Sequence, residues 1–247
     1  MRKSTIAAIT TVLLISQVIF SACKKSESAR AKTAPEAHQQ AMLNKYFEES
    51  KKAIAAKVNG ETITMFSLLR EMNAIAPQYL AKGQQKTHEL DEKVRNDALN
   101  GLILQTLGVQ EARKRGMKVT PDTIDSEIKK IKASRGSDGY RAYLANNGLT
   151  EDLLRKTIEE DALFEMIAAQ EVDAKITVTG AALRERYKKE KAGLKDASHR
   201  QMTFEAAKEV LEQKIRAEAA ESKMREWTKD LRKNARIEIV EQKKRQS

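Results

Sequence analysis

The sequence predicts a mostly α-helical protein with a small β element, and three observations support this fold class. Charged residues make up 33% of the 247-residue chain and aromatic residues only 4%, a composition typical of long exposed helices rather than of a β-sandwich. Apolar side chains recur every three to four residues along several long segments, as on one face of a helix. Only two short stretches have the pattern of strands.

The chain begins with a segment typical of a secretory signal peptide. Arg2 and Lys3 precede an apolar run from Ile6 to Phe20. This run is shorter than the roughly 20 apolar residues that cross a bilayer, and small residues follow it, as at a signal cleavage site. We therefore expect residues 1–22 to be removed on export.

Cys23 is the only cysteine of the chain, so an internal disulfide is excluded. The tetrapeptide Phe20-Ser21-Ala22-Cys23 resembles a bacterial lipobox, in which the cysteine is acylated and becomes the N-terminus, although leucine is usual in place of Phe20. The alternative is an unused thiol at the end of a signal peptide. One acyl chain binds a membrane only marginally, whereas the resemblance implies several chains, palmitate among them, and thus a stable anchor. Lys24 is not the aspartate that commonly retains lipoproteins at the inner membrane, so we expect a lipoprotein on the periplasmic side, at the outer membrane.

Residues 23–35 are polar and predict a flexible stalk. Residues 36–53 predict a helix with a weak apolar stripe. Residues 54–64 predict a β-hairpin, because Asn59-Gly60 separates two β-prone runs and suits a type I′ turn. Thr64 is then an N-cap residue for a helix over residues 65–76, which we expect Pro77 to end.

The middle of the chain predicts four helices. They span residues 89–115, 120–135, 137–147 and 151–175. Gly116 is the C-terminal cap of the first, which contains Gly101 and Gly108. Thr120-Pro121 begins the second, and Thr150 caps the last. The two internal glycines each cost about 1 kcal/mol relative to alanine, so they indicate a kink or a close helix contact.

The last third begins with a helix from Thr179 to Tyr187, followed by a polar stretch. The longest helix covers residues 203–234, and alternation of polar and apolar residues predicts a closing strand at residues 236–240. Residues 241–247 form a charged tail. We expect residues 36–240 to form a single helical domain.

The residues that support catalysis are scarce. His38, His88 and His199 are the only histidines, and their spacing matches no zinc motif. A Gly-rich phosphate-binding loop is absent, so we expect no nucleotide and no cofactor. The adjacent carboxylates from Glu159 to Asp161 point around a helix, which indicates an acidic surface rather than an acid–base pair. We expect a non-enzyme without a metal.

The formal net charge is +11, which in a cytosolic protein would suggest a nucleic-acid partner. An exported protein rarely meets nucleic acid, so the positive charge favours anionic lipid headgroups or acidic unfolded polypeptides as partners. Alternatively, the excess of lysine and arginine only keeps the helix faces soluble.

A binding surface is the more plausible functional feature. Methionine adapts to varied apolar partners, although a methionine at helical spacing also serves as core filler. The residues expected to contact an unfolded client are Met65, Phe66, Leu69, Met72, Tyr140 and Tyr143.

The order of the segments resembles the SurA-type and PrsA-type periplasmic foldases over about residues 55–240. The similar segments are 58–64, 102–104, 111–121, 124–128, 143–144, 148–151, 153–155, 175–179, 183–187, 204–208, Trp227 and 235–239. In this family a parvulin-type prolyl isomerase domain usually stands between the last two helices. Here only residues 188–203 occupy that place, far fewer than a domain needs.

The resemblance implies a long-helix peptide-binding fold, similar to the SurA N-terminal and trigger-factor C-terminal domains, with the hairpin paired to the closing strand. It implies a lipid-anchored, ATP-independent chaperone that binds unfolded or nascent secreted and outer-membrane proteins in an apolar cradle, without isomerase activity. Two alternatives stay open: a scaffold or adaptor lipoprotein that docks one envelope-assembly partner, and a peptidyl-prolyl isomerase.

Overall fold

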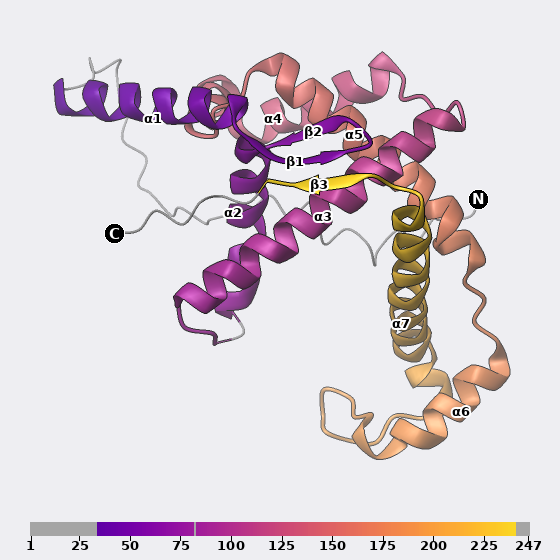
Figure 1. Ribbon diagram of the computed structural model, residues 1–247. Coiled ribbons are helices and arrows are strands. Elements are labelled where there is room, and N and C mark those ends of the chain that lie inside the picture. The colour runs from indigo at the N-terminus through magenta and orange to yellow at the C-terminus, as the bar shows by residue number, and fades with distance from the viewer. Residues whose placement is uncertain (1–33, 82, 241–247) are drawn as a thin grey trace. The chain divides into compact units, whose positions relative to one another are not determined.

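The structure of the protein is a computed structural model that describes residues 34–81 and 83–240 (Figure 1). The predicted signal peptide, Cys23, nearly all of the predicted stalk and the charged tail lie outside the described residues. The described chain divides into two compact units: residues 34–165 with 231–240, and residues 166–230. As predicted, the fold is mostly helical with one small antiparallel sheet.

The first unit opens with helix α1 (Ala34–Lys52) and the predicted hairpin, β1 (Ile54–Val58) and β2 (Glu61–Thr64). The turn residues Asn59 and Gly60 have φ angles of 53° and 89°, the positive values that a type I′ turn requires. Strand β3 (Ile237–Ile239) pairs antiparallel with β1, so the sheet order is β2-β1-β3 (Figure 1). The hairpin and its pairing with the closing strand are therefore confirmed.

Helices α2 (Met65–Ala81) and α3 (His88–Lys114) pack against this sheet and form the main core. Its fully buried side chains come from the sheet, from α2 and from α3, and they include Ala56, Val58, Leu68 and Ile103. The alternation of side chains along β1 places Ala56 and Val58 on one face, where the apolar stripes of both helices meet them.

The predicted end of α2 at Pro77 is wrong, because the helix continues to Ala81 with Pro77 inside it. A proline in a helix removes one donor and crowds the preceding turn, at a cost of about 3 kcal/mol. Beyond the proline, the Tyr79 hydroxyl donates to the Asp97 carboxylate of α3 at 2.5 Å, and the Lys93 ammonium lies 5.6 Å from the Tyr79 ring. Contacts with α3 thus stabilise the last turn, and the local sequence does not contain them.

Helix α3 agrees with its prediction to within one residue at each end. The Thr87 hydroxyl accepts a hydrogen bond from the Leu90 amide at 3.1 Å, and Gly116 has a φ of 75° just beyond the C-terminus. The helix runs through Gly101 without a break, and a Cβ atom added at Gly101 would meet nothing within 4 Å. Gly101 therefore marks no close contact.

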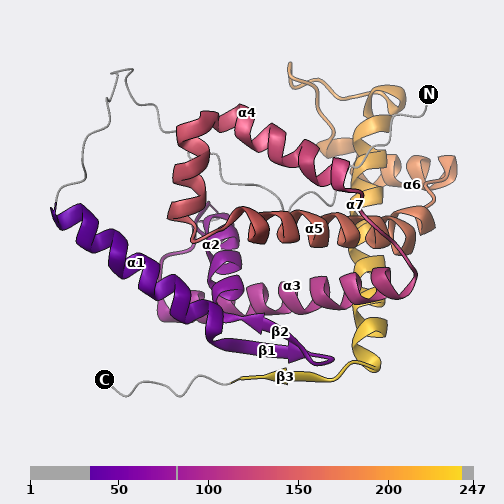
Figure 2. The same cartoon turned by 90° about the horizontal axis from the view of Figure 1, so that it is seen from above.

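Helices α4 (Pro121–Asn146) and α5 (Glu151–Glu171) follow. Figure 2 shows α4 bent at its middle, where Gly136 has φ 68° and ψ 171°, so the two predicted helices are present with the break between them. Ile128 and Tyr140 of α4 form a second apolar cluster with Leu154 of α5. Gly148, between the helices, has a φ of 61°, and a Cβ atom there would lie 2.6 Å from the Phe47 ring. Only glycine fits this connection.

In the second unit, α5 ends four residues earlier than predicted and a short 3-10 turn (Asp173–Lys175) follows. The unit is completed by helix α6 (Gly180–Glu190), a second 3-10 turn (Lys191–Gly193) and helix α7 (Phe204–Lys233). The α7 residues from Leu231 onward belong to the first unit. The unit has its own core of Leu183, Leu194, Ala207 and Leu211. The Tyr187 hydroxyl donates to the Met202 carbonyl at 2.8 Å and ties α6 to the segment before α7.

Candidate functional site

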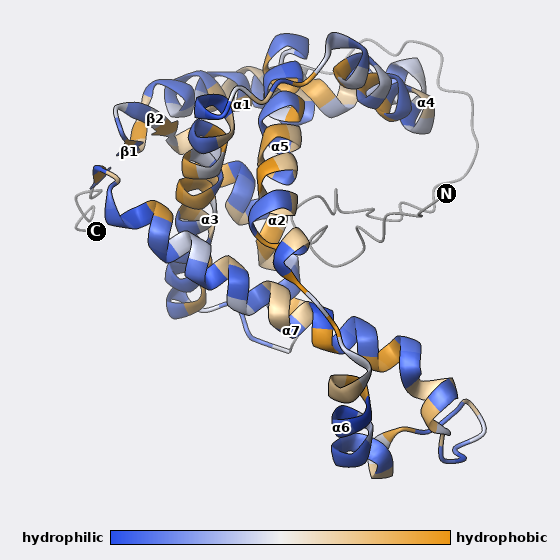
Figure 3. Cartoon of the chain, turned by 90° about the vertical axis from the view of Figure 1, so that its right-hand side faces the viewer, coloured by the Kyte–Doolittle hydropathy of each residue, from blue (hydrophilic) through white to orange (hydrophobic). Residues whose placement is uncertain are grey.

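Helix α2 carries four of the six side chains expected to contact a client. Figure 3 shows that apolar residues recur along α2, α3 and α5 of the first unit. Met65 and Phe66 are buried, Phe66 with only 3% of its surface exposed. Leu69 and Met72 are half-buried, and Met72 packs against the main core. Of these four, Leu69 and Met72 are therefore the ones that a polypeptide can reach without a rearrangement.

Phe66 joins α2 to α1. Its ring meets the Phe47 ring edge to face, with centroids 5.9 Å apart, an arrangement that stabilises aromatic pairs. The Lys51 ammonium lies 5.3 Å from the Phe66 centroid, and the Arg70 guanidinium lies 5.9 Å from it. Phe66 is thus a packing residue in this structure, enclosed by a ring and two cations.

The two predicted tyrosines lie on the second half of α4. Tyr140 is 5% exposed, its hydroxyl donates to Glu151 at 3.3 Å, and the Lys132 ammonium lies 4.8 Å from its ring. Burial, with the nearby Glu151 carboxylate, raises the pKa of Tyr140. Tyr143 is half-buried, with the Arg135 guanidinium 4.3 Å from its ring.

The six expected residues do not gather in one cluster. Met65 and Met72 belong to the core against the sheet, and Tyr140 and Tyr143 belong to the cluster of α4 and α5. Their contact with a client stays a prediction. In the structure three of the six side chains are buried and three are half-buried. Residue type alone does not predict this division.

Helix α1 presents apolar side chains that sequence reasoning did not select. Met42 is 62% exposed, and Leu43 and Tyr46 are also exposed, whereas Phe47 turns inward. The weak apolar stripe over residues 36–53 was the available signal. It resembled a poor core helix, but in the structure most of it faces solvent, where its apolar side chains are accessible to a partner.

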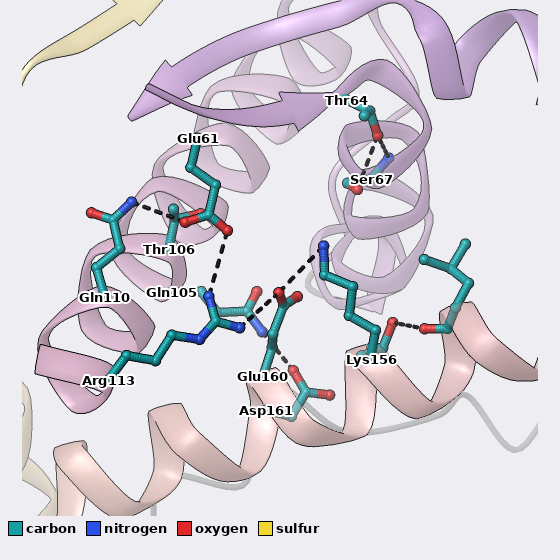
Figure 4. Close-up of polar contacts among 12 residues, drawn as sticks. Glu61, Thr64, Ser67, Gln105, Thr106, Gln110, Arg113, Lys156, Glu160 and Asp161 are labelled. Atoms are coloured by element: carbon teal, nitrogen blue, oxygen red, sulfur yellow. Dashed lines mark hydrogen bonds and ion pairs between the residues drawn. The ribbon is translucent and has the colours of Figure 1, made fainter. Parts of the chain in front are cut away.

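A polar network links β2, α3 and α5 (Figure 4). Arg113 lies 3.8 Å from the Glu61 carboxylate and 3.4 Å from the Glu160 carboxylate, and Lys156 lies 3.6 Å from Glu160. Gln110 donates to Glu61 at 3.0 Å. Each charge has an opposite neighbour and partial access to water, which indicates a structural connection between helices and not a reactive group.

Asp161 departs from the acidic surface expected for residues 159–161. It is half-buried and accepts a hydrogen bond of 2.5 Å from the Gln105 amide of α3 (Figure 4). Burial raises the pKa of Asp161 to about 6. The positive charge of Arg70 lowers this pKa, but by less than burial raises it. The partial burial of Asp161 thus follows from the way α5 packs against α3.

Within residues 34–81 and 83–240, no group of three or more histidine, cysteine, aspartate or glutamate side chains is placed to hold a metal ion. Over the same residues, no helix combines the length and the apolar character that crossing a bilayer requires.

Comparison with known proteins gives one family and several relatives. A family model described as the SurA-like N-terminal domain matches residues 2–168. The Chaperone SurA of Bordetella pertussis is 30% identical over 160 residues, 63% of this chain and 30% of the relative. That of Pectobacterium atrosepticum is 27% identical over 129 residues, 51% of this chain and 29% of the relative. The chain thus matches less than a third of the length of these relatives.

Among solved structures, a chain from a study of PEB4 and Cj1289, described as two structurally related SurA-like chaperones of Campylobacter jejuni, is similar with a TM-score of 0.49. It is 13% identical in sequence, and the similarity covers 77% of this chain and 100% of that one.

Proposed function

The chain belongs to the family of SurA-like N-terminal domains, and from this membership we propose that it is a periplasmic chaperone that binds unfolded secreted or outer-membrane polypeptides without nucleotide. The family match over residues 2–168 is the observation that carries the proposal, because it includes the hairpin and helices α1 to α4 complete. The curated relatives in which this domain occurs bear the name Chaperone SurA.

The apolar side chains that retain access to water support this proposal. They are Leu69, Met72 and Tyr143 from the predicted set, and Met42 and Tyr46 of α1. Burial of an apolar side chain stabilises a complex by about 1.5–3 kcal/mol, and ordering of the client offsets part of this gain. A few such contacts give weak, reversible binding near the micromolar range, which suits a chaperone that releases its client without ATP.

We propose further that Cys23 is acylated and holds the protein at the periplasmic face of the outer membrane. Support for this comes from the sequence, where Cys23 directly follows Ser21 and Ala22 at the end of the apolar run. Incorporation of labelled palmitate into the wild-type chain, and none into Cys23→Ser, is the expected result. Equal labelling of both would contradict it.

We also propose that the chaperone works without an isomerase module. Residues 191–203, between α6 and α7, form a 3-10 turn and a short loop closed by the Lys195–Gln201 bridge, and a domain needs about 50 residues or more. Measurable acceleration of X-Pro isomerisation by the purified protein would contradict this part.

The central test is suppression of aggregation of a reduced, unfolded client, followed by light scattering, with residues 23–247 carrying Cys23→Ser. We expect protection at a few-fold molar excess. Photo-crosslinkers at Leu69, Met72 and Tyr143 should capture the client, and one at Val210, an exposed apolar residue of α7, serves as the matched control. Absence of protection, or recovery of one stoichiometric folded partner instead of many unfolded clients, would favour the scaffold alternative.

A further inference from the structure

Strand β3 pairs with β1 along one of its two backbone edges. The Asn59 amide donates to the Arg236 carbonyl at 2.8 Å, and the Val240 amide donates to the Ala55 carbonyl at 2.9 Å. Between these two hydrogen bonds, Lys57 of β1 lies opposite Glu238 of β3. Residues 236, 238 and 240 therefore direct their N–H and C=O groups toward β1. In an antiparallel pair these directions alternate, so the backbone groups of Ile237 and Ile239 point away from β1.

That outward edge has no partner strand among the described residues, because the sheet has the order β2-β1-β3 and β3 stands at its end. It offers two donors and two acceptors, from Ile237 and Ile239. The side chain of Ile237 packs against the main core, whereas Ile239, two residues further on the same face, is 53% exposed. An uncovered edge is a template for another strand, and at three residues β3 has room for a short segment of one.

We propose that an extended segment of an unfolded client adds to this edge as a fourth strand. The inference rests on the proposed function and specifies how part of the client is held. Main-chain hydrogen bonds are available in every polypeptide, so strand addition recognises an extended backbone with little dependence on its sequence. The exposed Ile239 supplies an apolar neighbour, which favours client segments with alternating apolar and polar residues.

Charge argues against a second copy of the chain as the occupant. An antiparallel β3–β3 pair that uses both outward residues must place Ile237 of each copy opposite Ile239 of the other. Glu238 of one copy then stands directly opposite Glu238 of the other, at a position where the Cα atoms approach to about 4.5 Å and like charges are destabilising. Each copy also has a positive formal net charge, +11 for the full sequence. A client segment has neither restriction.

The substitution Ile239→Pro tests the donor directly. It removes the outward N–H and no hydrogen bond to β1, and proline is tolerated on an edge strand at such a position. The matched control, Ile239→Ala, shortens the side chain but keeps the N–H group. Both are made in residues 23–247 carrying Cys23→Ser, and circular dichroism with thermal unfolding confirms that each variant folds.

The probe is a fluorescent twelve-residue peptide of alternating valine and threonine, with binding measured by fluorescence anisotropy. Loss of one backbone hydrogen bond is expected to weaken binding about three- to tenfold for Ile239→Pro, with a smaller loss for Ile239→Ala. Binding of Ile239→Pro equal to wild type would overturn the proposal. So would a wild-type dimer in sedimentation that Ile239→Pro dissociates, which identifies a second copy as the occupant.

Amide hydrogen exchange tests the same point without a substitution. In the free protein the outward amides of Ile237 and Ile239 should exchange fast, and the amide of Val240, which is bonded to β1, should exchange slowly. Binding of the peptide should slow the exchange of the Ile237 and Ile239 amides. Unchanged exchange at saturating peptide would refute strand addition. If the wild type prevents aggregation of a client but does not bind the peptide, only this inference fails; if it does neither, the proposed function fails as well.

Discussion

The substitution Asp161→Asn probes how α5 is held against α2 and α3. Asp161 accepts a hydrogen bond from Gln105 at 2.5 Å, and Arg70 is the cation that acts on it, while Glu160 and Glu165 add negative charge nearby. Asparagine keeps an acceptor oxygen for Gln105 but carries no charge. The substitution therefore removes the cost of a partly buried carboxylate and leaves the hydrogen bond in place.

The magnitude follows from the pKa. Burial raises the pKa of Asp161 from 3.8 to about 6 in the folded protein, so the folded state holds this proton more tightly than the unfolded state does. The contribution of Asp161 to stability is thus fully present below about pH 4 and is lost as the pH rises through about 6. The difference of about two pKa units corresponds to about 3 kcal/mol. Burial raises the pKa values of Glu71 and Glu165 too, and they act in the same direction.

Urea unfolding followed by circular dichroism at pH 4 and at pH 7.5 measures this effect. We expect Asp161→Asn to raise the free energy of unfolding by about 2–3 kcal/mol at pH 7.5 and to change it little at pH 4. Asp152→Asn, at an exposed position in the first turn of the same helix, is the control; because a carboxylate there interacts favourably with the helix dipole, its loss should lower stability by no more than about 1 kcal/mol. Destabilisation by Asp161→Asn at pH 7.5 would show that attraction to Arg70 outweighs burial, and would refute the reasoning.

Four other substitutions test the fold of the first unit by thermal and urea unfolding. Gly148→Ala should lower the free energy of unfolding by about 2–4 kcal/mol, because the backbone has positive φ and the new methyl group meets Phe47; Gly101→Ala, in open space on α3, should instead raise it by about 1 kcal/mol. Equal effects of the two would contradict the close approach. Asn59→Ala removes side-chain hydrogen bonds of 2.8 Å to α3 and to the residue before β3 and should cost about 2 kcal/mol; no loss would mean that the turn alone sets the sheet. Ile103→Ala empties a fully buried core position and should cost about 2–5 kcal/mol, and a value below 1 kcal/mol would place Ile103 outside the core.

Local chemistry made much of the fold predictable. Asn59 and Gly60 form the turn expected of them, and Thr64, Thr150 and Thr179 each accept a hydrogen bond from an amide of the helix that follows. These signals act over two to four residues, so they are legible in the sequence. Pro77 is one exception, because contacts of Tyr79 with α3 outweigh a local signal, and the early end of α5 is another.

The candidate site was less predictable, since exposure is a property of neighbours. Met65 and Leu69 stand one helical turn apart in an apolar pattern, yet one is buried and the other half-buried. The Phe66 ring is covered by Phe47 from α1, and no property of α2 indicates that. Met42, the most exposed large apolar residue in the described part of the chain, lies in a helix whose apolar stripe is weak in the sequence.

By itself the sequence predicted most of the secondary structure, the closing strand and the family resemblance, because these depend on residue type, spacing and order along the chain. Only the tertiary structure decided which apolar side chains retain access to water, that Asp161 enters a partly buried contact with α3, and that the outer edge of β3 pairs with no other strand of residues 34–81 and 83–240. Each of these depends on atoms brought together from distant parts of the chain, where packing and desolvation outweigh the preference of any single residue.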